Sequence, residues 1–158
     1  MIEQQIELLL QRCRERGLKL RTAESCTAGA IAAAIASVPG ASDVLDRGWI
    51  TYSNEAKCEE LNVSPSLISE YGAVSREVVL AMAEGGASKQ AICVAVSGIA
   101  GPDGGSDEKP VGTVWIGIAG GGYAPVAESY LFSGDRAEVQ RQTVSSAIDM
   151  LICQIKAE

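Results

Sequence analysis

Residues 22–29 read T-A-E-S-C-T-A-G, and two hydroxyls and a thiol are adjacent in it at Ser25, Cys26 and Thr27. A strand-like run precedes this segment, and the alanine-rich residues 30–36 after it predict a helix. Ser25, Cys26 and Thr27 therefore fall where a strand turns into a helix. Free N–H groups gather at a helix N-terminus and favour negative charge. The segment predicts either a plain helix cap by Ser25 or Thr27, or a nucleophile beside an oxyanion site.

The chain contains no histidine, and this restricts the chemistry open to any nucleophile in it. Neither a Ser-His-Asp triad nor a Cys-His dyad can be built, and metal sites that need histidine are excluded. A serine nucleophile then needs a lysine, a tyrosine or a carboxylate as its base. Lys57 shortly follows a predicted strand at residues 47–52. A partly desolvated lysine loses its proton more readily, so Lys57 is a candidate base for Ser25.

Three further groups could complete such a site. Tyr52, five residues before Lys57, could relay a proton or hold the lysine. The backbone N–H groups of Thr27 and Ala28 could stabilise an oxyanion. Plain structural interpretations remain open, with Lys57 a solvated lysine on a glutamate-rich helix and Tyr52 a strand residue packing on its neighbour. Pairing with Ser25 is what favours catalysis.

A glycine-rich stretch at residues 97–106 is the candidate substrate-binding loop, with Ser97, Gly98, Gly101, Gly104 and Gly105 as its candidate residues. Glycines let backbone N–H groups approach a phosphate closely, although the stretch matches neither a P-loop nor G-x-G-x-x-G. Arg136 opens the last predicted helix and, with Arg141, could clamp a phosphate or carboxylate. The alternatives are a surface connection and two surface arginines.

The composition bounds the protein class. A chain of 158 residues with 47% apolar residues can bury one full core, so we expect a single domain over residues 1–158. A net charge of −7 without a basic cluster argues against nucleic acid as a partner. No apolar run reaches the roughly 20 residues of a membrane span, and the polar start is unlike a signal peptide. We therefore expect neither a membrane partner nor export.

The five cysteines are an odd set without a C-x-x-C pair. This predicts neither a disulfide framework nor a zinc site, and it favours a reducing cytoplasm. A hydrolase that uses Cys26 is a weak alternative, because no histidine can form the thiolate pair, although a helix N-terminus alone lowers a thiol pKa.

Hydrophobic periodicity predicts about five strands interleaved with helices. The strands fall at residues 18–22, 47–52, 91–96, 113–119 and 127–132, and the predicted helix caps include Ser53, Ser75 and Asp135. The pattern indicates a three-layer α/β/α sandwich with a mixed, mostly parallel sheet and one antiparallel strand. Ligands of such sheets lie beyond the carboxyl ends of the strands. Residues 24–27, 52–57 and 97–106 are therefore expected to share one pocket.

Six motifs occur in the order T-A-E-S-C-T-A-G, T-Y-S-N-E-A-K, G-A-V-S, V-S-G-I-A-G-P-D-G-G-S, K-P-V-G-T-V and F-S-G-D-R. Together they resemble the CinA C-terminal domain family, over residues 18–155. The stand-alone members of that family include nicotinamide-nucleotide amidases, while other members lack this activity. The resemblance implies an α/β/α sandwich with a mixed sheet.

The resemblance also implies a reaction, the hydrolysis of nicotinamide mononucleotide to nicotinate mononucleotide and ammonia in pyridine nucleotide recycling. By motif, Ser25 would attack the carboxamide carbon, Lys57 would take its proton with Tyr52 beside it, and backbone amides after Ser25 would hold the oxyanion. The glycine loop and Arg136 would hold the ribose and phosphate. The resemblance implies no metal or other cofactor, and it implies a homodimer or higher homo-oligomer.

Two positions depart from the family pattern. Ala28 stands where the family often has glycine, and Gln140 stands where it usually has a second arginine, with Arg141 next to it. A methyl group at Ala28 could crowd the oxyanion site, and the shift at Gln140 turns a side chain by about 100° around a helix. These departures keep open a catalytically inactive nucleotide-binding or regulatory homologue of the same fold.

Overall fold

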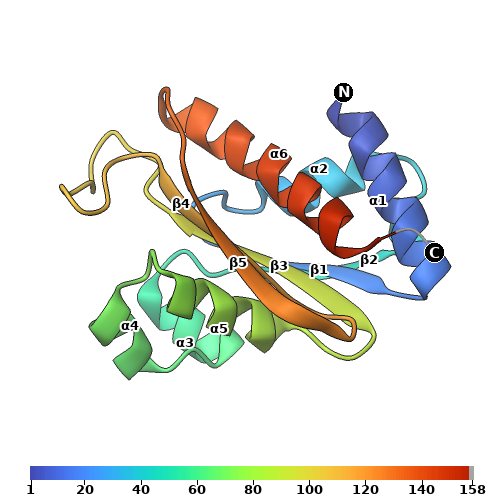
Figure 1. Cartoon of the computed structure of the whole chain (residues 1–158), viewed down its shortest axis with the longest axis horizontal. Helices are drawn as coiled ribbons and strands as arrows, with labels where there is room; N and C mark the ends of the chain where they lie inside the picture. Colours follow the sequence, from blue (N-terminus) through green and yellow to red (C-terminus); the bar gives the residue numbers. More distant parts are fainter. Residues whose placement is uncertain (157–158) are drawn as a thin grey trace.

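The computed structural model describes residues 1–156 and places a five-stranded sheet between two layers of helices (Figure 1). The strands are β1 (Lys19–Glu24), β2 (Leu45–Ile50), β3 (Ala91–Gly98), β4 (Thr113–Gly120) and β5 (Tyr123–Leu131). The helices are α1 (Ile2–Arg16), α2 (Ala30–Ala36), α3 (Asn54–Leu61), α4 (Pro65–Tyr71), α5 (Arg76–Gly86) and α6 (Arg136–Gln154), with a short 3-10 turn η1 (Ala41–Asp43).

Helices cover both faces of the sheet. Figure 1 shows α1, α2 and α6 on one face and α3, α4 and α5 on the other. A larger core packs the first group of helices on the sheet, and a smaller core lies under α3 and α5. Residues 91–97 of β3 are all buried, which confirms the prediction of a strand covered on both faces. Of the helices in residues 1–156, none is long and apolar enough to cross a membrane.

The sheet is mixed, and the prediction of a mostly parallel sheet is wrong. The strand order is β2-β1-β3-β4-β5. β1 pairs in parallel with β2 and β3, whereas β4 pairs antiparallel with both β3 and β5. β4 is the single reversed strand, but the hairpin that joins it to β5 leaves it inside the sheet. It therefore makes half of the four pairings antiparallel.

The three parallel strands create the crevice in which a site can form. α2 connects β1 to β2 over one face of the sheet, and α3, α4 and α5 connect β2 to β3 over the other face (Figure 1). Connections that diverge to opposite faces open a crevice at the carboxyl ends of the strands. Ser25 follows β1 at this edge, and β3 ends there with Ser97 and Gly98.

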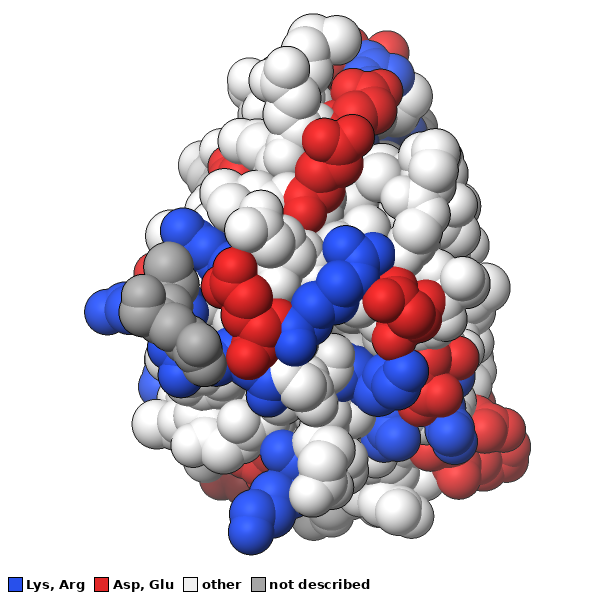
Figure 2. Space-filling view, turned by 90° about the vertical axis from the view of Figure 1, so that its right-hand side faces the viewer, with Lys and Arg blue, Asp and Glu red and all other residues white. Residues whose placement is uncertain are grey.

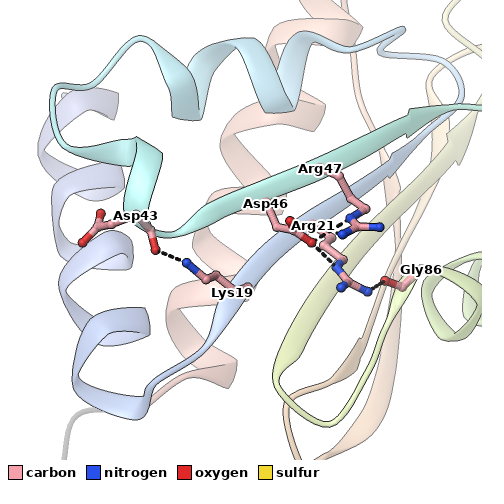
Figure 3. A network of polar contacts seen from close by, with 6 residues as sticks. All are labelled: Lys19, Arg21, Asp43, Asp46, Arg47 and Gly86. Atoms are coloured by element: carbon pink, nitrogen blue, oxygen red, sulfur yellow. Dashed lines mark hydrogen bonds and ion pairs between the residues drawn. The ribbon is translucent and has the colours of Figure 1, made fainter.

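A polar network fastens β1 to the edge strand β2 (Figure 3). Asp46 on β2 accepts hydrogen bonds from Arg21 at 2.8 Å and Arg47 at 2.7 Å, and Arg21 also reaches the carbonyl of Gly86 at the end of α5. The arginines hold the pKa of Asp46 below its ordinary value, Arg47 more strongly than Arg21. Lys19 adds a bond to the carbonyl of Asp43 in η1. The network thereby supports the register of β2.

Basic and acidic side chains are interspersed on the side of the molecule that lies at the right of Figure 1. Figure 2 shows this side, with Lys and Arg bordered by Asp and Glu. Ion pairs of the chain, including Arg14–Asp43 and Arg21–Asp46, each at 2.8 Å, also join side chains of opposite charge. Local neutralisation therefore limits the electrostatic potential on this side.

The predicted helix caps Ser53, Ser75 and Asp135 are confirmed. The side chains of Ser53, Ser75 and Asp135 each accept a hydrogen bond from the N–H three residues further on, at the starts of α3, α5 and α6. β2, however, ends at Ile50, two residues earlier than the predicted strand. Its last predicted residue, Tyr52, therefore belongs to the connection between β2 and α3.

Candidate active site

Ser25 and Lys57 are in direct contact at the carboxyl edge of the parallel strands. The Nζ atom of Lys57 lies 3.1 Å from the Oγ atom of Ser25. β1 delivers Ser25, and the first turn of α3, capped by Ser53, delivers Lys57. Ser25 is 7% exposed and Lys57 is 1% exposed. The interpretation of Lys57 as a solvated surface lysine is therefore wrong.

Backbone carbonyls surround the buried amine of Lys57. Its Nζ donates to the carbonyls of Thr51 at 3.0 Å, Tyr52 at 3.3 Å and Ser53 at 3.4 Å. Because β2 has ended at Ile50, these carbonyls lie outside the sheet and can turn toward the lysine. None of the ion pairs in residues 1–156 involves Lys57. Burial lowers the pKa of Lys57 below its ordinary value of 10.5.

This geometry suits a neutral amine at Lys57. A neutral amine has two N–H groups and one lone pair, whereas an ammonium has three N–H groups and no acceptor. Two N–H groups can remain on the carbonyls, which leaves the lone pair to accept the hydroxyl proton of Ser25. The pair can therefore act as a nucleophile and its general base.

The turn between β1 and α2 has a strained backbone. Ala28 has a φ of 49° and Gly29 a φ of 98°, so two successive residues adopt the left-handed conformation. The N–H of Ala28 donates to the carbonyl of Ser25 at 3.0 Å and is therefore occupied. The N–H of Thr27 makes no hydrogen bond within the described part of the chain. Of the two predicted oxyanion donors, the one on Thr27 is free.

The start of α2 is capped by Glu24, not by Ser25 or Thr27 as the plain interpretation of the segment has it. The carboxylate of Glu24 accepts hydrogen bonds from the N–H groups of Ile31 at 2.9 Å and Ala32 at 3.0 Å. It also accepts one from the hydroxyl of Thr27 at 2.6 Å. These donors of α2 are therefore not available to a ligand.

Cys26 lies in the same turn but is buried. Burial raises the pKa of its thiol to about 12, so the thiol stays protonated at neutral pH. This disfavours a cysteine nucleophile. The carbonyl of Cys26 accepts a hydrogen bond from Nε2 of Gln140 at 3.0 Å. The glutamine at this departure from the family pattern thus ties α6 to the turn.

Tyr52 contacts Lys57 through its backbone and Arg136 through its side chain. Its hydroxyl accepts a hydrogen bond from Nη2 of Arg136 at 2.7 Å, and the residue as a whole is 55% exposed. Nη1 of Arg136 donates to the carbonyl of Gly101, also at 2.7 Å. Arg136 therefore joins the glycine-rich loop to the connection after β2. The interpretation of Tyr52 as a packed strand residue is wrong.

A cavity of about 180 Å³ opens at the Ser25–Lys57 pair. Its walls bring together several predicted residues with some that sequence reasoning missed, and they are formed by Ser25, Cys26, Tyr52, Asn54, Lys57, Ala73, Val74, Ser97, Gly98, Ala100 and Arg136. The missed residues Asn54, Ala73 and Val74 lie within the motifs T-Y-S-N-E-A-K and G-A-V-S. Those motifs were the available signal.

A second cavity of about 660 Å³ shares Ala100 and Arg136 with the first and is also lined by Gln140. Gly104 and Gly105 line a third hollow within their own loop, so they do not join the Ser25 cavity. Within residues 1–156, no three His, Cys, Asp or Glu side chains are grouped to hold a metal ion.

The comparison with known families decides the relationship. The pattern of the CinA C-terminal domain matches residues 2–155. This chain belongs to the CinA C-terminal domain family. The nicotinamide-nucleotide amidohydrolase PncC of Pseudomonas putida is 50% identical to it, over 88% of this chain and 88% of that protein. The protein of the same name from Enterobacter agglomerans is 52% identical, over 82% of this chain and 80% of that protein.

Members of the CinA C-terminal domain family differ in length. This chain spans 36% of the length of a competence-damage inducible protein of Caldicellulosiruptor saccharolyticus, to which it is 46% identical over 92% of its own length. Among solved structures, the competence/damage inducible protein CihA of Agrobacterium tumefaciens superposes with a TM-score of 0.93 at 38% identity. That match covers 98% of this chain and 96% of the other.

Proposed function

We propose that this chain is a nicotinamide-nucleotide amidase that converts nicotinamide mononucleotide to nicotinate mononucleotide and ammonia. The observation that carries the proposal is the 3.1 Å contact between Ser25 and a buried Lys57 that has no carboxylate partner in residues 1–156. The names and the coverage of the two PncC relatives support the choice of substrate.

Acylation begins at the hydroxyl of Ser25. Lys57 takes the hydroxyl proton as the oxygen attacks the carboxamide carbon, and a tetrahedral intermediate forms. The free N–H of Thr27 is the proposed donor to its oxyanion, since that of Ala28 is already bonded to the carbonyl of Ser25. Lys57 then passes the proton to the amide nitrogen, the C–N bond breaks, and ammonia leaves an ester on Ser25.

Deacylation repeats these steps with water as the nucleophile. Lys57 takes a proton from water as the water oxygen attacks the ester carbon. The bond to Ser25 breaks, and Lys57 returns the proton to the serine oxygen. Nicotinate mononucleotide leaves, and both side chains are restored. The reaction consumes one water and needs no group beyond the chain's own residues.

The rest of the nucleotide has room in the second cavity. Arg136 lies between the two cavities, and its guanidinium suits a phosphate. Ser97 and Gly98 line the small cavity beside the reacting amide. We propose that these residues bind the substrate, and that Gly101 contributes by holding Arg136 through its carbonyl.

A binding module without catalysis is the second candidate. The observation that favours it is the turn after Ser25, where the N–H of Ala28 is bonded to the carbonyl of Ser25 and only one of the two predicted oxyanion donors stays free. A protein that binds the nucleotide without releasing ammonia would be this regulatory homologue.

Ammonia release from nicotinamide mononucleotide and from free nicotinamide tests the proposal. We expect turnover of the nucleotide, weaker turnover of free nicotinamide, and abolition by Ser25→Ala. Ser37→Ala is the matched control, because Ser37 is exposed at the far end of α2. Unchanged activity in Ser25→Ala, or no ammonia from the unsubstituted protein, would refute the amidase.

A further inference from the structure

Glu24, directly before the proposed nucleophile, carries a buried carboxylate that the proposed chemistry does not use. It is 1% exposed, and its oxygens accept from the hydroxyl of Thr27 and from the N–H groups of Ile31 and Ala32. No ion pair in residues 1–156 includes it. Burying a carboxylate costs free energy unless donors are fixed around it. A neutral residue in place of Glu24 would therefore cap α2 at a lower cost in free energy.

The backbone of Glu24 lies on a hydrogen-bonded path between the two reacting residues. The carbonyl of Glu24 accepts from the N–H of Thr51 at 2.8 Å, and the carbonyl of Thr51 accepts from Nζ of Lys57 at 3.0 Å. On the other side, the N–H of Ser25 donates to the carbonyl of Val96 at 3.2 Å. Glu24 thus fixes the backbone on which Ser25 faces Lys57.

The side chain of Glu24 fixes the far side of the same turn. Ala28 holds a left-handed conformation, which is strained for a residue with a side chain, and such strain persists only where surrounding contacts enforce it. Thr27 directly precedes Ala28, and its bond to Glu24 is 2.6 Å long. The carboxylate therefore anchors the turn that sets the direction of the hydroxyl of Ser25.

We propose that Glu24 is a positioning residue for Ser25, which acts through Thr27 and the start of α2 to direct the serine oxygen toward Lys57. This inference rests on the proposed amidase function. It implies that weakening the Glu24–Thr27 contact slows the chemical step without weakening substrate binding. A purely structural role would change thermal stability and leave the rate per folded molecule unaltered.

Thr27→Val and Thr27→Ser form the main pair of test variants. Valine keeps the volume of threonine but loses the hydroxyl, whereas serine keeps the hydroxyl. For nicotinamide mononucleotide we expect Thr27→Val to lower kcat by roughly tenfold or more, since small misplacements of reacting groups have large effects on rate. KM should stay within about twofold, because the substrate contacts remain. Thr27→Ser should recover most of the lost rate.

Glu24→Gln extends the test to the carboxylate itself, and Ser37→Ala is again the control. If Glu24→Gln does not fold, the Thr27 pair alone decides. A second readout is the rate at which a fluorophosphonate probe labels the serine, which does not depend on the nucleotide. Glu24→Gln and Thr27→Val should label at least several-fold more slowly than the unsubstituted protein and the control.

The outcomes separate this inference from the proposed function. Failure of the unsubstituted protein to label at Ser25 and to release ammonia would refute the amidase. Labelling and turnover that are equal in the unsubstituted protein, Thr27→Val and Glu24→Gln would refute the positioning role alone. A rise in KM at constant kcat, or a lower melting temperature with unchanged kcat, would also refute it.

Discussion

The guanidinium of Arg136 donates a 2.7 Å hydrogen bond to the phenol oxygen of Tyr52, a residue 84 positions earlier in the chain. Because the same guanidinium also holds the carbonyl of Gly101, its position depends on two separate segments. The phenol is thus part of the binding arrangement around the proposed phosphate site.

Tyr52 and Arg136 should therefore be energetically coupled in kcat/KM. We expect Tyr52→Phe and Arg136→Lys each to lower kcat/KM, and the double variant to lose at least about threefold less than the product of the single losses. A double-mutant cycle of ammonia release measures this. Losses that simply multiply would contradict the coupling.

The rate should depend on the protonation of Lys57. Burial lowers its pKa below 10.5, and only the neutral amine can accept a proton from Ser25. We expect kcat/KM to rise with pH and level off above the pKa of Lys57. In Lys57→Arg the guanidinium stays protonated and cannot accept the proton of Ser25. The kcat/KM of this variant should therefore fall by about a hundredfold or more. A kcat/KM that does not rise with pH, or that falls as the pH rises above neutrality, would contradict this assignment.

The same residue should make stability depend on pH. The pKa of Lys57 is lower in the folded than in the unfolded chain, so the unfolded chain binds more protons between those two values. The free energy of unfolding therefore rises with pH across that window, and below it the full cost of burying the charge is present. Relative to Lys57→Met, the native chain should gain stability as the pH rises toward 10.5, the ordinary pKa of lysine, in urea titrations. A difference that falls with pH would have the wrong sign.

Ala28→Gly should stabilise the fold. Ala28 has a φ of 49°, and the left-handed conformation costs a non-glycine residue about 1–2 kcal/mol. We expect a net gain in the free energy of unfolding of at most about 1 kcal/mol, because glycine loses more entropy on folding and this loss offsets part of the relieved strain. Ala33→Gly, at an exposed helical position of α2, should instead cost about 1 kcal/mol. Thermal unfolding of both variants checks the contrast, and a similar loss in each would contradict it.

Cys26 should resist alkylation in the folded protein. The pKa of its thiol is raised by burial to about 12, whereas Cys153 is exposed. Iodoacetamide at about pH 8 should label Cys153 and spare Cys26, since the thiolate is the reactive form. Peptide mass spectrometry gives the sites, and guanidinium-unfolded protein is the control. Rapid labelling of Cys26 with loss of turnover would instead favour the thiol as nucleophile.

Much of the fold and part of the site follow from local rules. Ser53 predicted the start of α3 because a serine before a helix accepts from the N–H three residues on, and that start places Lys57 on the first turn. The meeting of Ser25 with residues 52–57 and with Ser97 and Gly98 was predictable because parallel strands bring their carboxyl ends to one edge. The 3.1 Å contact itself needed the structure.

Other features depend on tertiary contacts that spacing does not encode. Local propensity favoured Ser25 or Thr27 as the cap of α2, but Glu24 folds back over the turn and takes those N–H groups. The place of β4 inside the sheet follows from where its hairpin docks. Gly104 and Gly105 lie in a hollow of their own, because their loop is long enough to fold on itself.

The reversed strand β4 carries the chain away from the reaction chamber. Its hairpin turn at Gly120–Gly122 lies beside Ile92 at the start of β3, and Gly98 at the other end of β3 lines the cavity. Eight residues of strand span about 25 Å, and a Cβ added at Gly122 would meet nothing within 4 Å, although the φ of 86° there strains any residue other than glycine. A fluorophore or surface tether joined at this tip would therefore report on the enzyme while leaving the chemistry untouched.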